Sequence, residues 1–233
     1  TPDGTLVGSI EGRAVEMDFL GRILMQLGQI DPENGWPWVE IPYLLHHEVH
    51  PLEGGHLLAL AHRSLRVNEY PGGYGDIRIS RFRPTTITDD GVLELTRDGR
   101  IVQEVWMSDL LDTHRIGFDS LDVEPFGFDW VHANAADRHP DGHTLVSMRH
   151  QDAVIEITPQ GELSWYLGNR HGLEQKVRDR TLDPIDDASW PWHQHAPTWI
   201  DDDKIVMFDN NVYGASPYSN RAPATGDSRI VAY

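Results

Sequence analysis

Three histidines recur at a similar place in the sequence. His47, His132 and His195 each precede a short apolar segment, by ten, thirteen and ten residues respectively. Histidine titrates near neutral pH, and its neutral nitrogen can serve as a nucleophile, a base or a metal ligand. No structural requirement for histidine recurs ahead of a strand, so this pattern predicts one shared functional site. The alternative is that each histidine caps a strand end by hydrogen bonding.

One arginine could join these histidines. Arg149 ends the segment TLVSMR, the apolar strand that follows His132. A guanidinium presents a planar fork of donors that suits a tetrahedral anion. The alternative is a surface salt bridge in an acidic chain. Three imidazoles could instead hold a zinc or copper ion, but a neighbouring Arg149 would repel a metal cation, so we expect no metal.

The remaining histidines have less distinctive positions. His46 and His150 adjoin candidate residues, and alternation along a strand would point them to the opposite face. His193 shares a face with His195 and could support it. The others are expected in solvated loops: His56, His62, His139, His143 and His171.

A repeat must position these residues. The segments VEMDFLGRILMQL (15–27), LELTRDGRIVQEV (93–105) and IEITPQGELSWYL (155–167) align on a central glycine. Apolar residues alternate on both sides of that glycine, which predicts a β-hairpin rather than a helix. A short apolar strand precedes the hairpins or stands alone in the last copy: TLVGS (5–9), LLALA (57–61), TLVSM (144–148) and IVMFD (205–209).

One inner strand followed by a hairpin, repeated with turns between, is typical of β-propeller blades. We therefore predict an all-β fold over residues 1–233, with about four blades forming an incomplete arc of a six-bladed ring, both ends being cut. Equivalent positions of successive blades would then face one channel. The excess length falls at 63–84 and 169–192, which are expected to be loops, and short helices are expected at 109–115 and 173–180.

Composition excludes several classes of function. The chain has 19 basic and 37 acidic residues, a net charge of −18, so binding to nucleic acid or anionic lipid is not expected. No run of about 18 apolar residues predicts a membrane helix. The absence of cysteine excludes disulfides and thiolate-ligated metals.

The residues also carry a family resemblance. The segment DWVHANAADRHPDGHTLVSMRHQDAVIEIT (129–158) resembles the central motifs D-W-x-H-x-N and S-x-R-H-Q of bacterial, propeller-type arylsulfotransferases. The segments QHAPTWIDDDKIVMFDNN (194–211), HHEVHPLEGGHLLAL (46–60) and SRIVAY (228–233) resemble further segments of that family. The resemblance extends over essentially the whole chain.

The resemblance implies a six-bladed propeller that moves a sulfuryl group from an aryl sulfate ester to a phenol through a sulfohistidine, without a nucleotide donor or other cofactor. By motif, it makes His195 the nucleophile, with His132, Arg149 and His47 as its partners. Asn134 follows the motif and could bind substrate in the channel. The choice of His47 over His46 rests on its position next to Glu48.

Partners and location follow from the same resemblance. It implies small aryl sulfates and phenols as partners, with no nucleic acid or membrane, and a periplasmic or secreted location; a homodimer stays open. Two other functions remain as alternatives: a non-catalytic propeller that binds or scaffolds, and a hydrolase or oxidase with a histidine-ligated metal. The joint presence of three equivalent histidines and one arginine favours the transferase.

Overall fold

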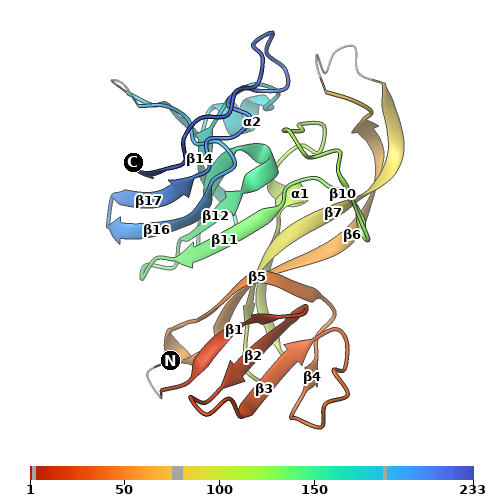
Figure 1. The fold of residues 1–233 in the computed structure, drawn as a ribbon, viewed down its shortest axis with the longest axis vertical. Coiled ribbons are helices and arrows are strands. Elements are labelled where there is room, and N and C mark those ends of the chain that lie inside the picture. The colour runs from red at the N-terminus through yellow and green to blue at the C-terminus, as the bar shows by residue number, and fades with distance from the viewer. Residues whose placement is uncertain (2–3, 75–80, 186–187) are drawn as a thin grey trace. The chain divides into compact units, whose positions relative to one another are not determined.

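The computed structural model describes all residues except 2–3, 75–80 and 186–187. It is an all-β fold of four sheets built from strand meanders, as predicted (Figure 1). The chain forms two compact units, which are described separately below. One comprises Thr1–Arg63 and Gly91–Val105, and the other comprises Ser64–Asp90 and Trp106–Tyr233. No helix among the described residues is long and apolar enough to cross a membrane.

The three predicted hairpins are confirmed. They join β2 (Arg13–Met17) to β3 (Ile23–Gly28), β7 (Phe82–Leu95) to β8 (Ile101–Trp106), and β13 (Ala153–Ile157) to β14 (Leu163–Gly168). Each turn is closed by its glycine amide, which donates to the carbonyl three residues earlier. The glycines have φ angles of 79°, 84° and 82°, the left-handed region that disfavours other residues.

The first unit contains the first sheet and part of the second. β1 (Leu6–Ile10), β2 and β3 form an antiparallel meander, and β4 (Val39–Glu40) adds in parallel to β3. β5 (Leu44–Pro51) pairs with the start of β6 (Leu57–Pro71). Between them lies the 3-10 turn Glu53–Gly55.

The second unit contains two complete meanders. The first consists of β11 (Ala133–Arg138), β12 (Thr144–Met148), β13, β14 and the short parallel strand β15 (Thr181–Leu182). The second consists of β16 (His195–Asp201), β17 (Lys204–Asp209) and β18 (Arg229–Ala232). β16 lies against β11 and β12. The core between the sheets is apolar: Leu145, Val154, Leu167, Ile205 and Met207.

Each sheet that carries a candidate histidine has a strand that the repeat did not predict. β5, β11 and β16 precede the predicted inner strands and pair with them. The predicted pattern of one strand plus a hairpin is therefore one strand too short. The added strands contain or directly follow the candidate histidines: His132 and His195 lie at strand entrances, and His47 lies within β5.

Two expectations for the connections are wrong in part. Residues 63–71 and 82–84 are strand, not loop, because β6 and β7 extend into a long hairpin in the second unit, where β10 (Gly127–Asp129) pairs with β7 and with β9 (Val123–Glu124). The centre of that stretch, 75–80, lies outside the described residues. The helices are shorter than expected: α1 is Met107–Leu110 and α2 is Gln175–Arg178.

Candidate functional site

His132 is held by a buried carboxylate. It directly precedes β11, and its Nδ1 lies 2.5 Å from Oδ2 of Asp129, the last residue of β10. Burial lowers the pKa of His132, but the hydrogen bond and charge of Asp129, together with the charge of Asp90, outweigh it. The net result is a pKa above the ordinary histidine value. This environment favours the protonated form of His132 more than water does.

Arg149 lies next to this pair. It opens the 3-10 turn Arg149–Gln151 after β12, and its Nη1 lies 2.7 Å from Nε2 of His150 and 3.3 Å from Oδ2 of Asp119. The His150 ring stacks on His132, with 4.6 Å between ring centroids and 25° between planes. Arg149 and His132 are therefore joined through one imidazole. The side chain of Arg149 keeps 25% of its surface exposed.

The expectation that His150 points away from the site is wrong. It assumed strand alternation, but Arg149–Gln151 is a helical turn and Asp152 follows with φ 47°. His150 Nδ1 donates to the backbone oxygen of Asp129 at 2.7 Å, while Nε2 accepts from Arg149. Both contacts suit a neutral ring, and burial lowers the pKa of His150 to about 4.

This buried histidine predicts a loss of stability in acid. Because its folded pKa is below the unfolded value of about 6.5, His150 binds a proton more readily in the unfolded state. Its contribution to stability is complete above that value and is lost as pH falls toward 4. We expect the free energy of unfolding to drop by about 3 kcal/mol more in the native protein than in His150→Gln between those limits. Denaturant unfolding at several pH values measures this difference, and parallel curves would contradict it.

His195 begins β16 and is half-buried. Its Nδ1 lies 3.0 Å from Nδ2 of Asn210. Burial lowers the pKa of His195, a hydrogen bond to the backbone of His193 raises it, and the charges of Arg149 and His132 lower it further. The net pKa is below the ordinary value. The charges of Arg149 and His132 thus act on His195, while direct contact of His195 with them stays a prediction.

His193 is a buried member of the same cluster and contacts two of its aspartates. It is fully buried, with Nδ1 2.7 Å from Asp152 Oδ1 and Nε2 3.3 Å from Asp119 Oδ2. Asp119 therefore bridges His193 and Arg149. The expectation that His193 would support His195 agrees with these contacts, since the His193 carbonyl also accepts from Asn210 Nδ2 at 2.6 Å.

Asn134 links the two meanders. It is 4% exposed, and its Nδ2 donates to the backbone oxygen of Gln194 at 2.9 Å. The Gln194 side chain in turn donates to the Ala153 oxygen at 2.7 Å. These contacts fix the segment that carries His195 against β11. Substrate binding by Asn134 stays a prediction.

His47 belongs to the other unit. Its Nδ1 lies 2.8 Å from Nδ1 of His46, and the register of β5 with β6 shifts between His46 and Val49. The backbone of His47 is left-handed, with φ 51°. Its participation beside His132, Arg149 and His195 stays a prediction.

Unfavourable backbone conformations gather in the cluster. Asp119, His132, Asp152 and His193 all have positive φ, between 47° and 71°. A non-glycine residue in such a conformation costs about 1 kcal/mol or more, and such residues concentrate at functional sites. All four contribute side-chain contacts to the cluster. The local strain therefore favours a functional role over strand capping.

A metal ion is the alternative that these contacts must be tested against. Ligand atoms of Asp129, His132 and His150 lie within 4.8 Å of one another. However, Nδ1 of His150 contacts a backbone carbonyl and its Nε2 contacts Arg149, so both nitrogens are engaged in hydrogen bonds rather than directed at a shared metal ion. Arg149 also adds a positive charge beside the group. This donor set suits an anion better than a metal cation.

The sequence indicated some of these residues and not others. Asp129, His150 and Asp152 lie inside the segment DWVHANAADRHPDGHTLVSMRHQD, so the motif contained a signal for them. Asp119 lies in a loop without any motif, and only the folded chain places it against Arg149 and His193.

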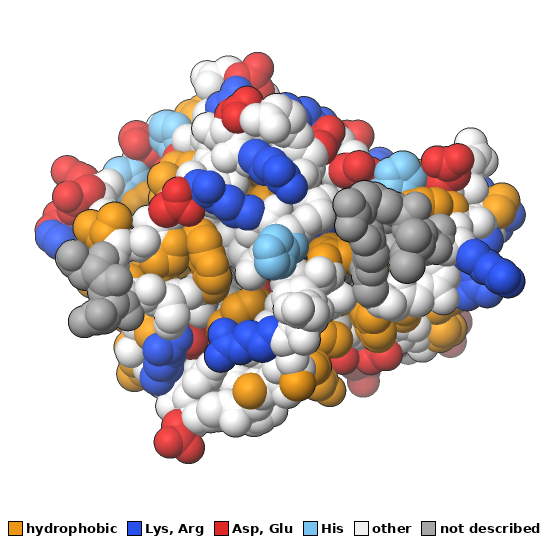
Figure 2. Space-filling view, turned by 90° about the horizontal axis from the view of Figure 1, so that it is seen from above, with side chains coloured by type: hydrophobic (Ala, Val, Ile, Leu, Met, Phe, Trp, Pro, Cys, Tyr) orange, Lys and Arg blue, Asp and Glu red, His pale blue; other side chains and the backbone are white. Residues whose placement is uncertain are grey.

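The surface of this acidic chain also retains basic groups: Figure 2 shows several Lys and Arg side chains on one face near a histidine.

Comparison with known proteins identifies the family of this chain. A model of the arylsulfotransferase (ASST) family matches residues 1–233. No curated protein matches the chain. Among solved structures, a crystal structure of a protein of unknown function from Bacteroides caccae has 11% identity and a TM-score of 0.33; the match covers 89% of this chain and 65% of that one. The chain thus spans less than two thirds of that relative. Because the family match covers every residue, the chain belongs to the arylsulfotransferase family.

Proposed function

We propose that the chain moves a sulfuryl group from an aryl sulfate to a phenol through a sulfohistidine at His195. The observation that carries this proposal is the opposite shift of two pKa values at one site: that of His195 is lowered and that of His132 is raised. Titratable groups driven apart in this way are suited to distinct nucleophile and acid roles. Arg149 beside them supplies a fixed positive charge.

In the first step, a neutral nitrogen of His195 attacks sulfur. The N–S bond forms as the S–O bond to the aryl group breaks, and the bonding electrons go to the phenolic oxygen. His132 gives its proton to that oxygen, because a phenol with a pKa of about 10 leaves poorly as an anion.

In the second step, the acceptor phenol reverses this chemistry. His132, now neutral, takes the phenolic proton as the oxygen attacks sulfur, and the N–S bond breaks to restore His195. Charge on the three peripheral sulfuryl oxygens grows in a loose transition state, as in phosphoryl transfer. Arg149 is placed to stabilise that charge. Asp119 and His150 orient the guanidinium through the contacts given above.

The direct test is turnover of an aryl sulfate. Purified protein is incubated with nitrophenyl sulfate and phenol, and release of nitrophenol and formation of phenyl sulfate are followed together. Transfer requires both products in equal amounts. Nitrophenol without phenyl sulfate would indicate hydrolysis, and no release at all would contradict the proposal.

The two pKa shifts predict a bell-shaped pH dependence for the first step. In single-turnover transfer from phenyl sulfate, the rate should fall in acid as His195 gains a proton and fall in alkali as His132 loses one. Asp129→Asn removes the charge that raises the pKa of His132. We therefore expect its alkaline limb to move to lower pH, while the acid limb stays in place.

The control for this prediction is an exposed carboxylate that contacts histidines elsewhere. Asp141 pairs with His139 and His143 in the turn before β12. Asp141→Asn should leave both limbs unchanged. An alkaline limb that does not respond to Asp129→Asn would remove His132 from the acid role.

A further inference from the structure

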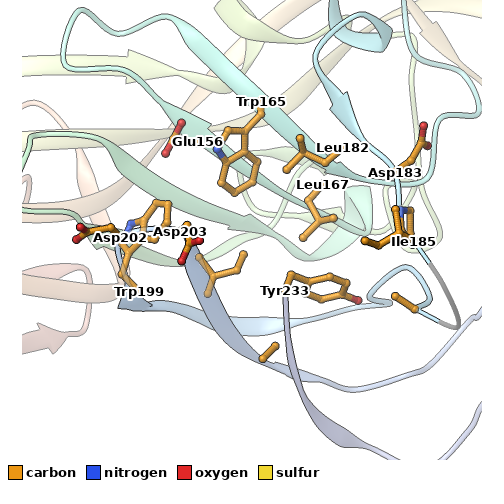
Figure 3. A pocket seen from close by; sticks show the side chains of 14 residues that line it. Glu156, Trp165, Leu167, Leu182, Asp183, Ile185, Trp199, Asp202, Asp203 and Tyr233 are labelled. Atoms are coloured by element: carbon orange, nitrogen blue, oxygen red, sulfur yellow. The ribbon is translucent and has the colours of Figure 1, made fainter.

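A cavity lies between the two meanders of the second unit (Figure 3). It has a volume of about 780 Å³. This lies in the range of small-molecule sites. Its wall is largely aromatic and aliphatic: Trp165, Leu167, Trp199, Ile205 and Tyr233. Trp199 lies four residues beyond His195 along β16, which is roughly 13 Å at the usual strand rise. The cavity is therefore separate from the histidine cluster.

Glu156 is the unusual residue in this wall. It lies on β13 two residues after Val154, whose side chain belongs to the apolar core between the sheets, so both face the same side. Glu156 pairs across the sheet with Trp165 and is only 8% exposed. Among the described residues, no hydrogen bond or ion pair reaches its carboxylate. A carboxylate in a largely apolar wall, with no bond from these residues, is suited to pair with a cationic ligand.

The other carboxylates at the cavity already have partners. Asp183 pairs with Arg170, Asp202 lies 3.8 Å from His139, and Asp203 lies 3.5 Å from Lys204. Their side chains are 55%, 100% and 82% exposed, so they form a hydrated rim. No Lys or Arg is among the described residues that line the cavity. The negative charge of the Glu156 carboxylate therefore has no Lys or Arg counterpart among the described residues of the cavity wall.

We propose that this cavity binds an organic ammonium ion with an apolar or aromatic body. The charged nitrogen pairs with Glu156, and the body packs among Trp165, Trp199 and Leu167. The rings of Trp165 and Trp199 both line the cavity and lie 6.5 Å apart in an edge-to-face arrangement, with 79° between their planes. Aromatic faces attract cations, most strongly where water is excluded. This site is independent of sulfuryl transfer.

The test uses three ligands of one skeleton that differ in charge: 2-phenylethylammonium, 2-phenylethanol and 3-phenylpropionate. Binding is measured by calorimetry and by the fluorescence of the tryptophans. We expect the ammonium ion to bind at least about tenfold more tightly than the alcohol, as an ion pair with added cation–π attraction allows. The carboxylate should bind most weakly. Equal affinities for all three, or no binding of any, would overturn the proposal.

Two variants locate the charge that selects the cation. Glu156→Gln keeps the shape of the side chain and should reduce the preference for the ammonium ion over the alcohol to less than about threefold. Asp202→Asn removes an exposed rim carboxylate and should leave the preference unchanged. A preference that survives Glu156→Gln would contradict the assignment.

Discussion

Replacing His195 with alanine should lower the rate of sulfuryl transfer by at least about 10⁴-fold, as expected when a nucleophile is removed. His195 lies at the entrance of β16, half-buried, with a lowered pKa that keeps its ring neutral near pH 7. The variant loses the only atom that we propose to bond with sulfur. Release of nitrophenol from nitrophenyl sulfate measures the effect. The fold should persist, because the side chain of His195 is not part of the apolar core.

The covalent intermediate gives an independent measurement. Native protein incubated with nitrophenyl sulfate and quenched should carry the added mass of one SO₃ group on the peptide that contains His195. His143→Ala is the matched control, since His143 contacts Asp141 in an exposed turn. That variant should keep full activity and the adduct. An adduct on another residue, or near-native activity in His195→Ala, would exclude His195 as the nucleophile.

The sequence was sufficient for the hairpins because their signal is local. Alternating apolar residues flank Gly21, Gly99 and Gly161, and each glycine takes a left-handed turn that few other residues adopt. The extension of β6 and β7 was missed for the opposite reason. Residues 62–69 are exposed or half-buried, and only Leu65 and Val67 are apolar, so the apolar alternation is too short to mark the strand. Pairing across a long hairpin, rather than burial, maintains it.

The candidate site was predictable in part for similar reasons. His132, Arg149 and His195 stand out by motif and by their place before or after strands. Asp119 could not be found in this way, because its contacts with Arg149 and His193 join residues 30 and 74 positions apart. His150 was misplaced because a helical turn interrupts the strand alternation. Contacts that depend on tertiary structure leave no local signal in one sequence.

The second large effect is expected at Arg149. Arg149→Lys keeps a positive charge but loses the planar fork that contacts Asp119 and His150 and that can grip two sulfuryl oxygens. We expect transfer to slow by about 10²–10³-fold, the usual loss for one electrostatic stabiliser.

The leaving group separates this role from that of His132. Arg149 acts on the peripheral oxygens, so the loss in Arg149→Lys should be similar for nitrophenyl sulfate and phenyl sulfate. His132→Ala should instead cost little with nitrophenyl sulfate, whose phenolate leaves readily, and much more with phenyl sulfate, whose oxygen needs a proton. Single-turnover rates with both donors in both variants give this comparison. If Arg149→Lys showed the same dependence on leaving group as His132→Ala, Arg149 would act on the departing oxygen rather than on the sulfuryl group.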